Sequence, residues 1–471
     1  MIAAYLMVAL EWYGAFMLLF FFAINTYYLA LTLTGFWRTL RVFKEVRRPD
    51  QRRLLRSPLT PPISVLAPAF NEEANVVDNV RSLLMIDYPL FEVILVNDGS
   101  SDRTLGRLVD AFDLRPSARS FERSLSCRPI RGVYDSATYP NLVVVDKENG
   151  GKADALNAGL QLSLYPLFCA IDADSILEPD ALLRLVRPFV DAPGVTIAAG
   201  GVVRVANGCD IHGGRVHQVR LPRRPLPLIQ IVEYLRAFLF GRMGWSAGNS
   251  LLVISGAFGL FEKRAVILAG GYATDTVGED MELVVRMHRY RRDRKQPYRI
   301  GFVPDPVCWT EVPVSFRVLR RQRTRWQRGL IDTLIRHRGM IGRPRYGSVG
   351  MVSLPGFLFF ELLSPLVELS GYILLPVMWF LGILNPGAAW MFFVLAILYM
   401  VLVSALAVLL EDIAFRRYPS VRDLGRLLIG AVMENFGFRQ LAFWWRVRAF
   451  WEYLRGDLSW GVMERKGVGS A

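Results

Sequence analysis

Cysteine and histidine are scarce in this sequence, which has only four of each among 471 residues. The cysteines show no paired spacing, so neither a zinc finger nor a disulfide framework is expected. The histidines are equally dispersed, which argues against a metal site built from imidazole. The cysteines are therefore interpreted as ordinary residues of a reducing compartment, and they are Cys127, Cys169, Cys209 and Cys308.

Acidic residues are outnumbered, because 42 Asp and Glu stand against 56 Lys and Arg and leave a net charge of +14. A basic chain suits anionic lipid headgroups and a phosphorylated substrate. Nucleic acid is the rival explanation, but no zinc-finger or basic-zipper spacing accompanies the basic runs, which stand beside apolar segments. We therefore expect membrane lipids as partners and no nucleic acid.

Charged residues are absent from residues 12–33, an apolar and aromatic run that matches the roughly 20 residues needed to cross a bilayer as a helix. No small-residue cleavage site follows a short apolar core, so residues 1–36 are predicted to be a lasting anchor. Residues 37–60 are predicted to be a juxtamembrane linker, whose basic residues are Arg38, Arg41, Lys44, Arg47, Arg48, Arg52, Arg53 and Arg56. Because basic flanks stay on the cytoplasmic side, the N-terminus is predicted outside and the next domain in the cytosol.

The rest of the chain divides by composition into four predicted parts. Residues 61–315 alternate short apolar runs with helix-like segments, the pattern of an α/β domain with a mostly parallel sheet. Residues 316–348 are predicted to be amphipathic interface helices, residues 349–456 a second membrane block and residues 457–471 a cytosolic tail. We therefore predict a cytosolic α/β domain inserted between transmembrane helices.

Three segments are harder to interpret. Residues 349–384 are too long for one straight span and contain three prolines, so a surface or re-entrant helix followed by a crossing is expected. Residues 424–451 are apolar but dotted with polar groups, and a full crossing there would place a basic tail outside. The number of crossings stays open for this reason. Residues 114–139, rich in Arg and Ser, are expected to be a loop.

Several apolar runs of the α/β domain each end in polar residues suited to a charged ligand. The runs are residues 63–67, 91–96, 142–145 and 167–171, and they lead into Asn71 and Glu72, Asp98, Asp146 and Lys147, and Asp172 and Asp174. Because the carboxyl ends of parallel strands lie along one edge of a sheet, these residues are expected to build one site.

Lys152 and an aspartate pair offer the chemistry of a diphosphate site. Gly151 and Lys152 open a predicted helix whose amides, dipole and lysine suit phosphate oxygens. Asp172 and Asp174 follow a buried strand, and such hard oxygen ligands suit Mg²⁺ or Mn²⁺ bridging to a donor's phosphates. The carboxylate of Asp98 can accept hydrogen bonds from a nucleobase or ribose. Taken alone, however, the tripeptide Asp98-Gly99-Ser100 is better explained by a turn followed by a helix cap.

Two further motifs carry acceptor chemistry. Glu279 and Asp280 open a predicted helix, where a carboxylate suits removal of a proton from an acceptor hydroxyl. Capping of the helix is the alternative. Gln322, Arg325 and Trp326 lie in a basic run, where arginine suits diphosphate oxygens and tryptophan offers a flat face to a sugar. A basic helix on the bilayer surface is the alternative for this run.

Taken together and in this order, the motifs resemble those of the inverting family-two glycosyltransferases of the GT-A fold. Within that family they are most similar to bacterial membrane synthases of poly-β-1,6-N-acetylglucosamine, with cellulose and hyaluronan synthases as more distant relatives. The resemblance runs from the anchor through Trp326 into the second membrane block. It implies a UDP-sugar donor, Mg²⁺ or Mn²⁺ as cofactor, and a multi-pass protein of the bacterial inner membrane with a cytoplasmic catalytic domain.

Residue roles are carried over from this resemblance position by position. Asp280 is implied as the catalytic base, with Asp174 and Arg325 as further catalytic residues. Nucleotide-sugar contacts are implied for Ala69, Glu72, Asp98, Lys152, Asp172, Gln322, Arg325 and Trp326. Acceptor contacts are implied for Gly256, Ala257, Phe258, Glu279 and Trp326, and a metal site for Asp172 and Asp174.

The implied activity is transfer of a sugar, with inversion, onto a growing β-linked exopolysaccharide, with N-acetylglucosamine from UDP-N-acetylglucosamine preferred. Glu361, Glu368 and Glu434 lie in apolar segments, where a costly ionisable group is expected to face a bundle interior, a polar cavity or the interface, and they are interpreted as lining a path for the polymer. Transfer of one sugar to a lipid acceptor and a non-catalytic membrane receptor are the alternatives. An accessory export or regulatory subunit stays open. Two departures from the family are a single N-terminal span and Gly278, where many members carry Thr or Ser.

Overall fold

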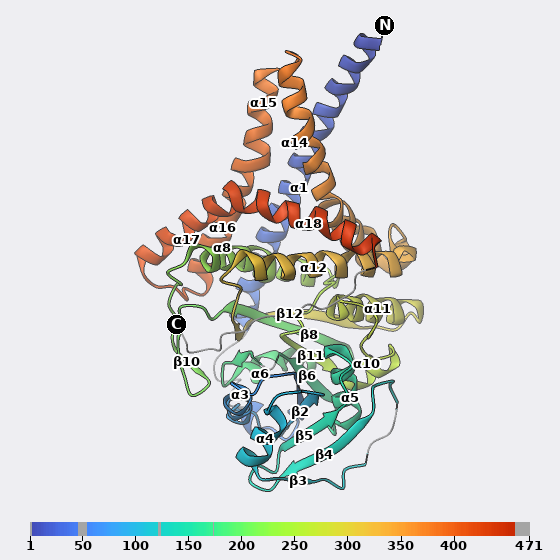
Figure 1. Cartoon of the computed structure of the whole chain (residues 1–471), viewed down its shortest axis with the longest axis vertical. Helices are drawn as coiled ribbons and strands as arrows, with labels where there is room; N and C mark the ends of the chain where they lie inside the picture. Colours follow the sequence, from blue (N-terminus) through green and yellow to red (C-terminus); the bar gives the residue numbers. More distant parts are fainter. Residues whose placement is uncertain (1, 46–53, 121–123, 173, 457–471) are drawn as a thin grey trace.

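The computed structural model describes residues 2–45, 54–120, 124–172 and 174–456. Figure 1 shows three levels along the long axis of the molecule. An α/β domain lies at one end, helices that run across the long axis form the middle, and α1, α14 and α15 extend to the other end. These three helices span Ile2–Glu45, Ser364–Phe380 and Pro386–Phe393. The predicted tail, residues 457–471, and residues 46–53 of the predicted linker lie outside the described ranges.

Ten strands form one mixed sheet in the order β3-β4-β5-β2-β1-β6-β11-β8-β12-β7. Their bounds are β1 Ile63–Ala69, β2 Phe91–Asp98, β3 Leu114–Pro116, β4 Ile130–Ser136, β5 Leu142–Lys147, β6 Leu167–Ile171, β7 Ile176–Leu177, β8 Thr196–Val205, β11 Phe258–Glu262 and β12 Arg299–Thr310. Neighbours β5, β2, β1 and β6 pair in parallel, and so do β8 and β12. β11 joins these two groups by antiparallel pairing with β6 and β8. The predicted α/β class with a mostly parallel sheet is confirmed.

The central strands are buried along their whole length, which explains why the sequence marks them so clearly. β2 and β5 contain runs of Val, Ile and Leu and β6 is apolar throughout, as expected when helices cover both faces of a parallel sheet. The helices of this domain are α3 Val76–Leu84, α4 Thr104–Phe112, α5 Lys152–Leu162, α6 Ala181–Leu185, α7 Arg187–Asp191, α10 Lys263–Leu268 and α11 Glu279–Asp293. A separate hairpin is formed by β9 Asp210–His212 and β10 Arg215–Gln218.

The expectation of a loop over residues 114–139 is wrong. β3 and β4 lie in this segment and extend the sheet beyond β5 by antiparallel pairing. β4 lies next to the edge strand β3 and its residues are mostly half-buried, so it lacks the apolar run that identifies the central strands. Its polar composition therefore resembled that of a loop.

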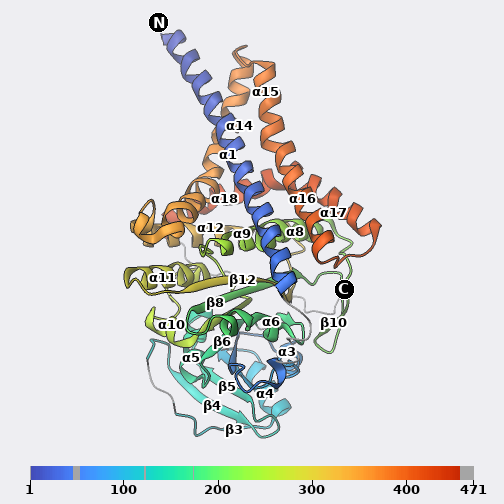
Figure 2. The same cartoon turned by 180° about the vertical axis from the view of Figure 1, so that it is seen from behind.

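Three described helical stretches are long and apolar enough to cross a membrane, judged by length and composition: Val8–Lys44, Val349–Phe380 and Pro386–Ala414. The second is broken into short helices, η4 Val349–Ser353, α13 Leu354–Gly356 and η5 Phe357–Leu362, before α14. The third continues from α15 through η6 Val394–Leu398 into α16 Tyr399–Ala414. Figures 1 and 2 place the N-terminus and the turn between α14 and α15 at the same end, far from the sheet.

The helices of the middle level run across the long axis (Figure 1). They include α8 Pro225–Glu233, η1 Tyr234–Gly241, α9 Arg242–Ala247, α12 Phe316–Arg336, α17 Val421–Met433, η7 Glu434–Phe438 and α18 Arg439–Leu454. α18 packs along α12, and α1 packs against α9 and η1. The backbone between α17 and α18 is non-helical at Phe436 and Gly437, so residues 424–451 form two helices rather than one continuous span.

Candidate active site

A cavity of about 2210 Å³ extends from the carboxyl ends of the parallel strands to the helices of the middle level. Of the residues predicted to bind or react, those that line it are Ala69, Glu72, Asp98, Lys152, Asp172, Asp174, Gly256, Ala257, Glu279, Asp280, Gln322, Arg325 and Trp326. Phe258 does not line it, because this residue is fully buried at the start of β11 and strand residues alternate between faces. Its side chain belongs to the core, which corrects the predicted acceptor contact.

Asp98, the last residue of β2, is buried and its carboxylate accepts three hydrogen bonds. Lys147 Nζ donates at 2.6 Å, Gly150 N at 3.0 Å and Gly151 N at 2.7 Å. Lys147 is fully buried and also lies 2.6 Å from Asp154. This carboxylate therefore fixes the loop that leads into α5, where Gly151 has a φ of +87° that favours glycine. A contact of Asp98 with a nucleotide stays a prediction.

Lys152, the first residue of α5, joins two sides of the cavity. Its ammonium donates to the Asp172 carboxylate and, at 3.1 Å, to the Gly256 carbonyl. Burial disfavours the charged ammonium, but nearby carboxylates, first that of Asp172, outweigh this and raise the pKa of Lys152. A Cβ at Gly256 would lie 2.8 Å from the Lys152 Nζ and would displace the ammonium. Glycine therefore lets the lysine reach both partners.

Asp280 and Glu279 stand in the first turn of α11, on the other side of Gly256. Gly256 N donates to Asp280 Oδ2 at 3.2 Å, and Met281 N donates to Asp280 Oδ1 at 2.8 Å. Glu279 is buried, and burial raises the pKa of its carboxyl to about 7 although the charge of Lys152 opposes the shift. Asp280 is thus connected to Lys152 through the Gly256 peptide.

Asp172 and Asp174 both line the cavity just after β6, and their oxygens are the hard ligands that Mg²⁺ and Mn²⁺ prefer. No group of three or more His, Cys, Asp and Glu residues is arranged to hold a metal ion in the part of the chain that the structure describes. Mg²⁺ is commonly bound by one or two carboxylates together with waters and substrate phosphates. The pair therefore fits a cation that also binds a donor's diphosphate.

α12 presents Gln322, Arg325 and Trp326 to the same cavity, because residues three and four apart share one face of a helix. Gln322 Oε1 is buried and has no hydrogen-bond partner among the residues described, so it can accept a hydrogen bond from a ligand. The charge of Arg325 acts on Glu279 and favours its ionised form. The α12 motif and the start of α11 therefore belong to one site.

A stack of arginines and aromatic rings beside Trp326 was not predicted from the sequence. The Arg323 guanidinium lies 4.3 Å from the Trp326 ring centroid, and the Phe238 ring lies 5.8 Å from that of Trp326. Arg242 lies 4.3 Å from the Phe238 ring, and Arg323 donates two hydrogen bonds to Glu233 at 2.8 and 2.7 Å. The stack orients Trp326. Phe238 and Arg242 are four residues apart, an ordinary spacing for one helix face, so no pattern in the sequence distinguishes them.

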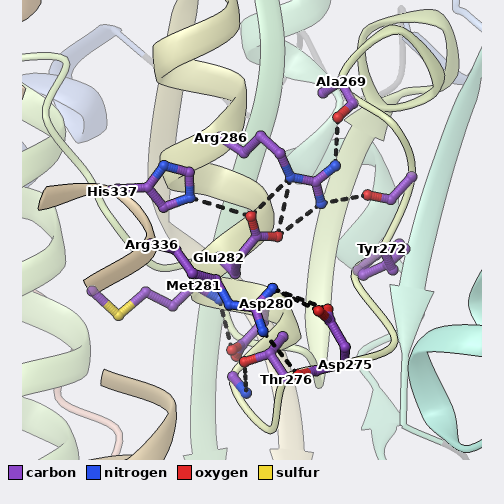
Figure 3. A network of polar contacts seen from close by, with 12 residues as sticks. Ala269, Tyr272, Asp275, Thr276, Asp280, Met281, Glu282, Arg286, Arg336 and His337 are labelled. Carbon is purple, nitrogen blue, oxygen red and sulfur yellow. Dashed lines mark hydrogen bonds and ion pairs between the residues drawn. The ribbon is translucent and has the colours of Figure 1, made fainter. Parts of the chain in front are cut away.

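Figure 3 shows a polar network that joins α11 to the end of α12. Glu282 accepts hydrogen bonds from Arg286, at 2.7 Å from Nη2, and lies 3.2 Å from His337 Nε2. Burial disfavours its charged form, but the bonds from His337 and Arg286 outweigh this and lower the pKa of Glu282 to about 2. Arg336 pairs with Asp275 at 3.0 Å. The contacts of the buried Glu282 with Arg286 and His337 hold the first turn of α11 in place relative to the end of α12, whereas Asp275 is exposed.

The acidic residues of the apolar segments are each paired with an arginine where the cavity enters the middle level. The pairs are Glu361 with Arg446 at 3.5 Å, Glu368 with Arg439 at 2.9 Å, and Glu434 with Arg236 at 2.6 Å. All six residues line the cavity, so these glutamates face it, which is one of the three environments expected for them. Pairing compensates charges that would be costly among apolar helices.

Two segments of the chain match models of known families. Residues 64–124 match the family described as glycosyl transferase family 2, and residues 129–329 match glycosyltransferase like family 2. The chain belongs to glycosyltransferase family 2, as its motifs predicted.

Two curated relatives are poly-beta-1,6-N-acetyl-D-glucosamine synthases. That of Staphylococcus epidermidis is 28% identical over 328 residues, 69% of this chain and 66% of the relative. That of Staphylococcus aureus strain COL is 28% identical over 275 residues, 58% of this chain and 56% of the relative. The match therefore spans less than two thirds of the length of either relative. A solved structure with a similar fold is that of a mannosyltransferase from Pyrobaculum calidifontis in complex with GDP-Man and Mn²⁺. The two structures have a TM-score of 0.48 and 18% sequence identity, and the alignment covers 92% of this chain and 99% of the mannosyltransferase chain.

Proposed function

We propose that this protein is an inverting membrane glycosyltransferase that transfers N-acetylglucosamine from UDP-N-acetylglucosamine onto a growing β-linked exopolysaccharide. Family membership supports a nucleotide-sugar transferase, and the names of the relatives support the sugar and the polymer. The proposed location is the bacterial inner membrane, with the α/β domain in the cytoplasm. The apolar stretches and the basic residues after the first of them support that placement.

A hydrogen-bonded path across the cavity carries this proposal. Asp172 accepts from Lys152, Lys152 donates to the Gly256 carbonyl, and the Gly256 amide donates to Asp280. The path places carboxylates suited to a cation and diphosphate at one end and a carboxylate suited to a base at the other. Donor and acceptor groups can therefore meet between them.

The proposed reaction is a single displacement. Asp280 accepts the proton of an acceptor hydroxyl while that oxygen forms a bond to the anomeric carbon of the donor sugar. The bond from that carbon to the diphosphate breaks on the opposite side, and UDP leaves with the electron pair. Lys152 and Arg325 stabilise the charge that develops on the diphosphate. Attack opposite the leaving group converts an α-linked donor into a β-glycoside.

Asp172 and Asp174 are the residues proposed to hold Mg²⁺ or Mn²⁺. Such a cation supplies a positive charge that offsets the charge on the departing diphosphate. Asp172 also accepts from Lys152, so the lysine keeps this carboxylate oriented toward the cavity. Gln322 is proposed to bind the donor, and Trp326 to stack on a sugar.

The route of the acceptor is proposed to follow the cavity toward the middle level. The paired glutamates and arginines there offer hydrogen-bonding groups, and Tyr28, Phe360, Phe438 and Phe443 line the same stretch. Polar groups between aromatic faces suit a hydrated sugar chain. A polysaccharide is therefore preferred to a lipid as the acceptor.

Release of UDP by the purified, detergent-solubilised protein tests the proposal. UDP-sugars are offered one at a time with Mg²⁺, with Mn²⁺ and with a chelator. UDP release from UDP-N-acetylglucosamine that the chelator abolishes, together with a product that grows in length, is the expected result. Release without a metal contradicts the metal site, and a lipid-soluble product with one sugar contradicts polymer synthesis. No release from any donor by the folded protein favours a non-catalytic receptor.

A further inference from the structure

Arg242, the first residue of α9, is a buried cation with an unusual environment. It is 6% exposed and lines the cavity. Several other basic residues along the cavity have a carboxylate partner, as Lys152 has in Asp172 and Arg323 has in Glu233. The side chain of Arg242 forms no ion pair or hydrogen bond with any of the residues described, and its Nη1 is a buried donor without an acceptor.

The guanidinium stays charged in this position. Burial lowers the pKa of Arg242 to about 10, although the negative charge of Asp280 opposes this shift. The group is therefore protonated at neutral pH. A buried charge is disfavoured unless hydrogen bonds and opposite charge compensate it. The face of the Phe238 ring, 4.3 Å away, compensates only part of this cost and uses none of the N–H donors. The donors are therefore available to a ligand.

Arg242 lines the same cavity as the groups assigned to the acceptor. The charge of Asp280, the proposed base, acts on its guanidinium. Phe238 connects it to Trp326, the ring proposed to carry a sugar. A sugar that stacks on Trp326 with a hydroxyl directed at Asp280 would occupy the cavity that this guanidinium lines.

We propose that Arg242 is an acceptor-binding residue that donates hydrogen bonds to hydroxyl oxygens of the acceptor's terminal sugar. The contact holds that sugar so that its attacking hydroxyl is directed at Asp280. The ligand is a neutral hydroxylated sugar, because the charge of Asp280 acts at this position and disfavours an anionic group. This inference rests on the proposed transferase function.

Separate measurement of donor hydrolysis and acceptor transfer tests the assignment. UDP release from UDP-N-acetylglucosamine is measured with water as the only acceptor and then with a soluble β-linked N-acetylglucosamine oligosaccharide. In Arg242→Gln we expect hydrolysis to change little and the KM for the oligosaccharide to rise about tenfold or more, because a charged donor is lost. Arg242→Lys, which keeps the charge but not the planar fork of donors, is expected to have an intermediate KM.

Arg264→Gln is the matched control, because Arg264 is exposed on α10 outside the cavity. It should leave both rates unchanged. An unchanged oligosaccharide KM in Arg242→Gln, in protein with wild-type melting and UDP binding, overturns the assignment. An effect seen only with a phosphorylated lipid acceptor overturns it as well. Wild-type protein that releases no UDP contradicts the proposed function itself, so the two failures are distinguishable.

Discussion

Replacement of Asp280 by Asn is expected to lower acceptor-dependent UDP release by about 10²- to 10⁴-fold, the usual contribution of a general base. Asparagine has the same size and can still accept the hydrogen bond that Gly256 N donates to Asp280 Oδ2 at 3.2 Å. It cannot accept the proton of the attacking hydroxyl. Binding of UDP should therefore persist while transfer is lost, which initial rates and a UDP-binding isotherm measure on the same preparation.

Asp275→Asn is the matched control for this change, five residues earlier in the chain. Asp275 is exposed and pairs with Arg336 at 3.0 Å, and such surface pairs contribute little to stability. Its transfer rate should stay within about twofold of wild type, because the residue does not line the cavity. Transfer by Asp280→Asn at a rate near that of this control would show that Asp280 is not the base.

Replacement of Lys147 by Met is expected to destabilise the α/β domain by about 3–5 kcal/mol, as found when one partner of a buried ion pair is removed. Lys147 is fully buried and lies 2.6 Å from both Asp98 and Asp154. Methionine fills a similar volume but leaves two buried carboxylates without their cation. The melting temperature of the solubilised protein, followed by tryptophan fluorescence, should fall by on the order of 10 °C.

Lys295→Met makes the same substitution at an exposed lysine in the turn after α11. Its melting temperature should stay within about 2 °C of wild type, because surface substitutions rarely change stability much. A melting temperature of Lys147→Met equal to that of this control would mean that Asp98 and Asp154 do not depend on the lysine.

The central sheet and the donor side of the site could be predicted from the sequence because both depend on local patterns. Buried parallel strands give continuous apolar runs, and polar residues directly after such runs must share one edge of the sheet. Lys152 and Asp172 were placed together by this rule, and the structure joins them by a hydrogen bond.

Features that depend on packing between distant segments could not be predicted in the same way. β4 lies near the edge of the sheet and lacks an apolar run. Phe258 looked like part of the acceptor loop but begins a buried strand. The stack of Arg242 and Phe238 on Trp326 joins helices far apart in the chain. The break that separates α17 from α18 is marked in the sequence only by Gly437, and a single glycine does not predict a break.

The anomeric configuration of the first glycosidic bond formed is the measurement that tests the central claim most directly. Purified protein is incubated with UDP-N-acetylglucosamine and a divalent cation, and the product is examined by NMR before any longer polymer forms. Direct attack assisted by Asp280 predicts a β-linkage from the α-linked donor. A product with an α-linkage would contradict single displacement and the role assigned to Asp280.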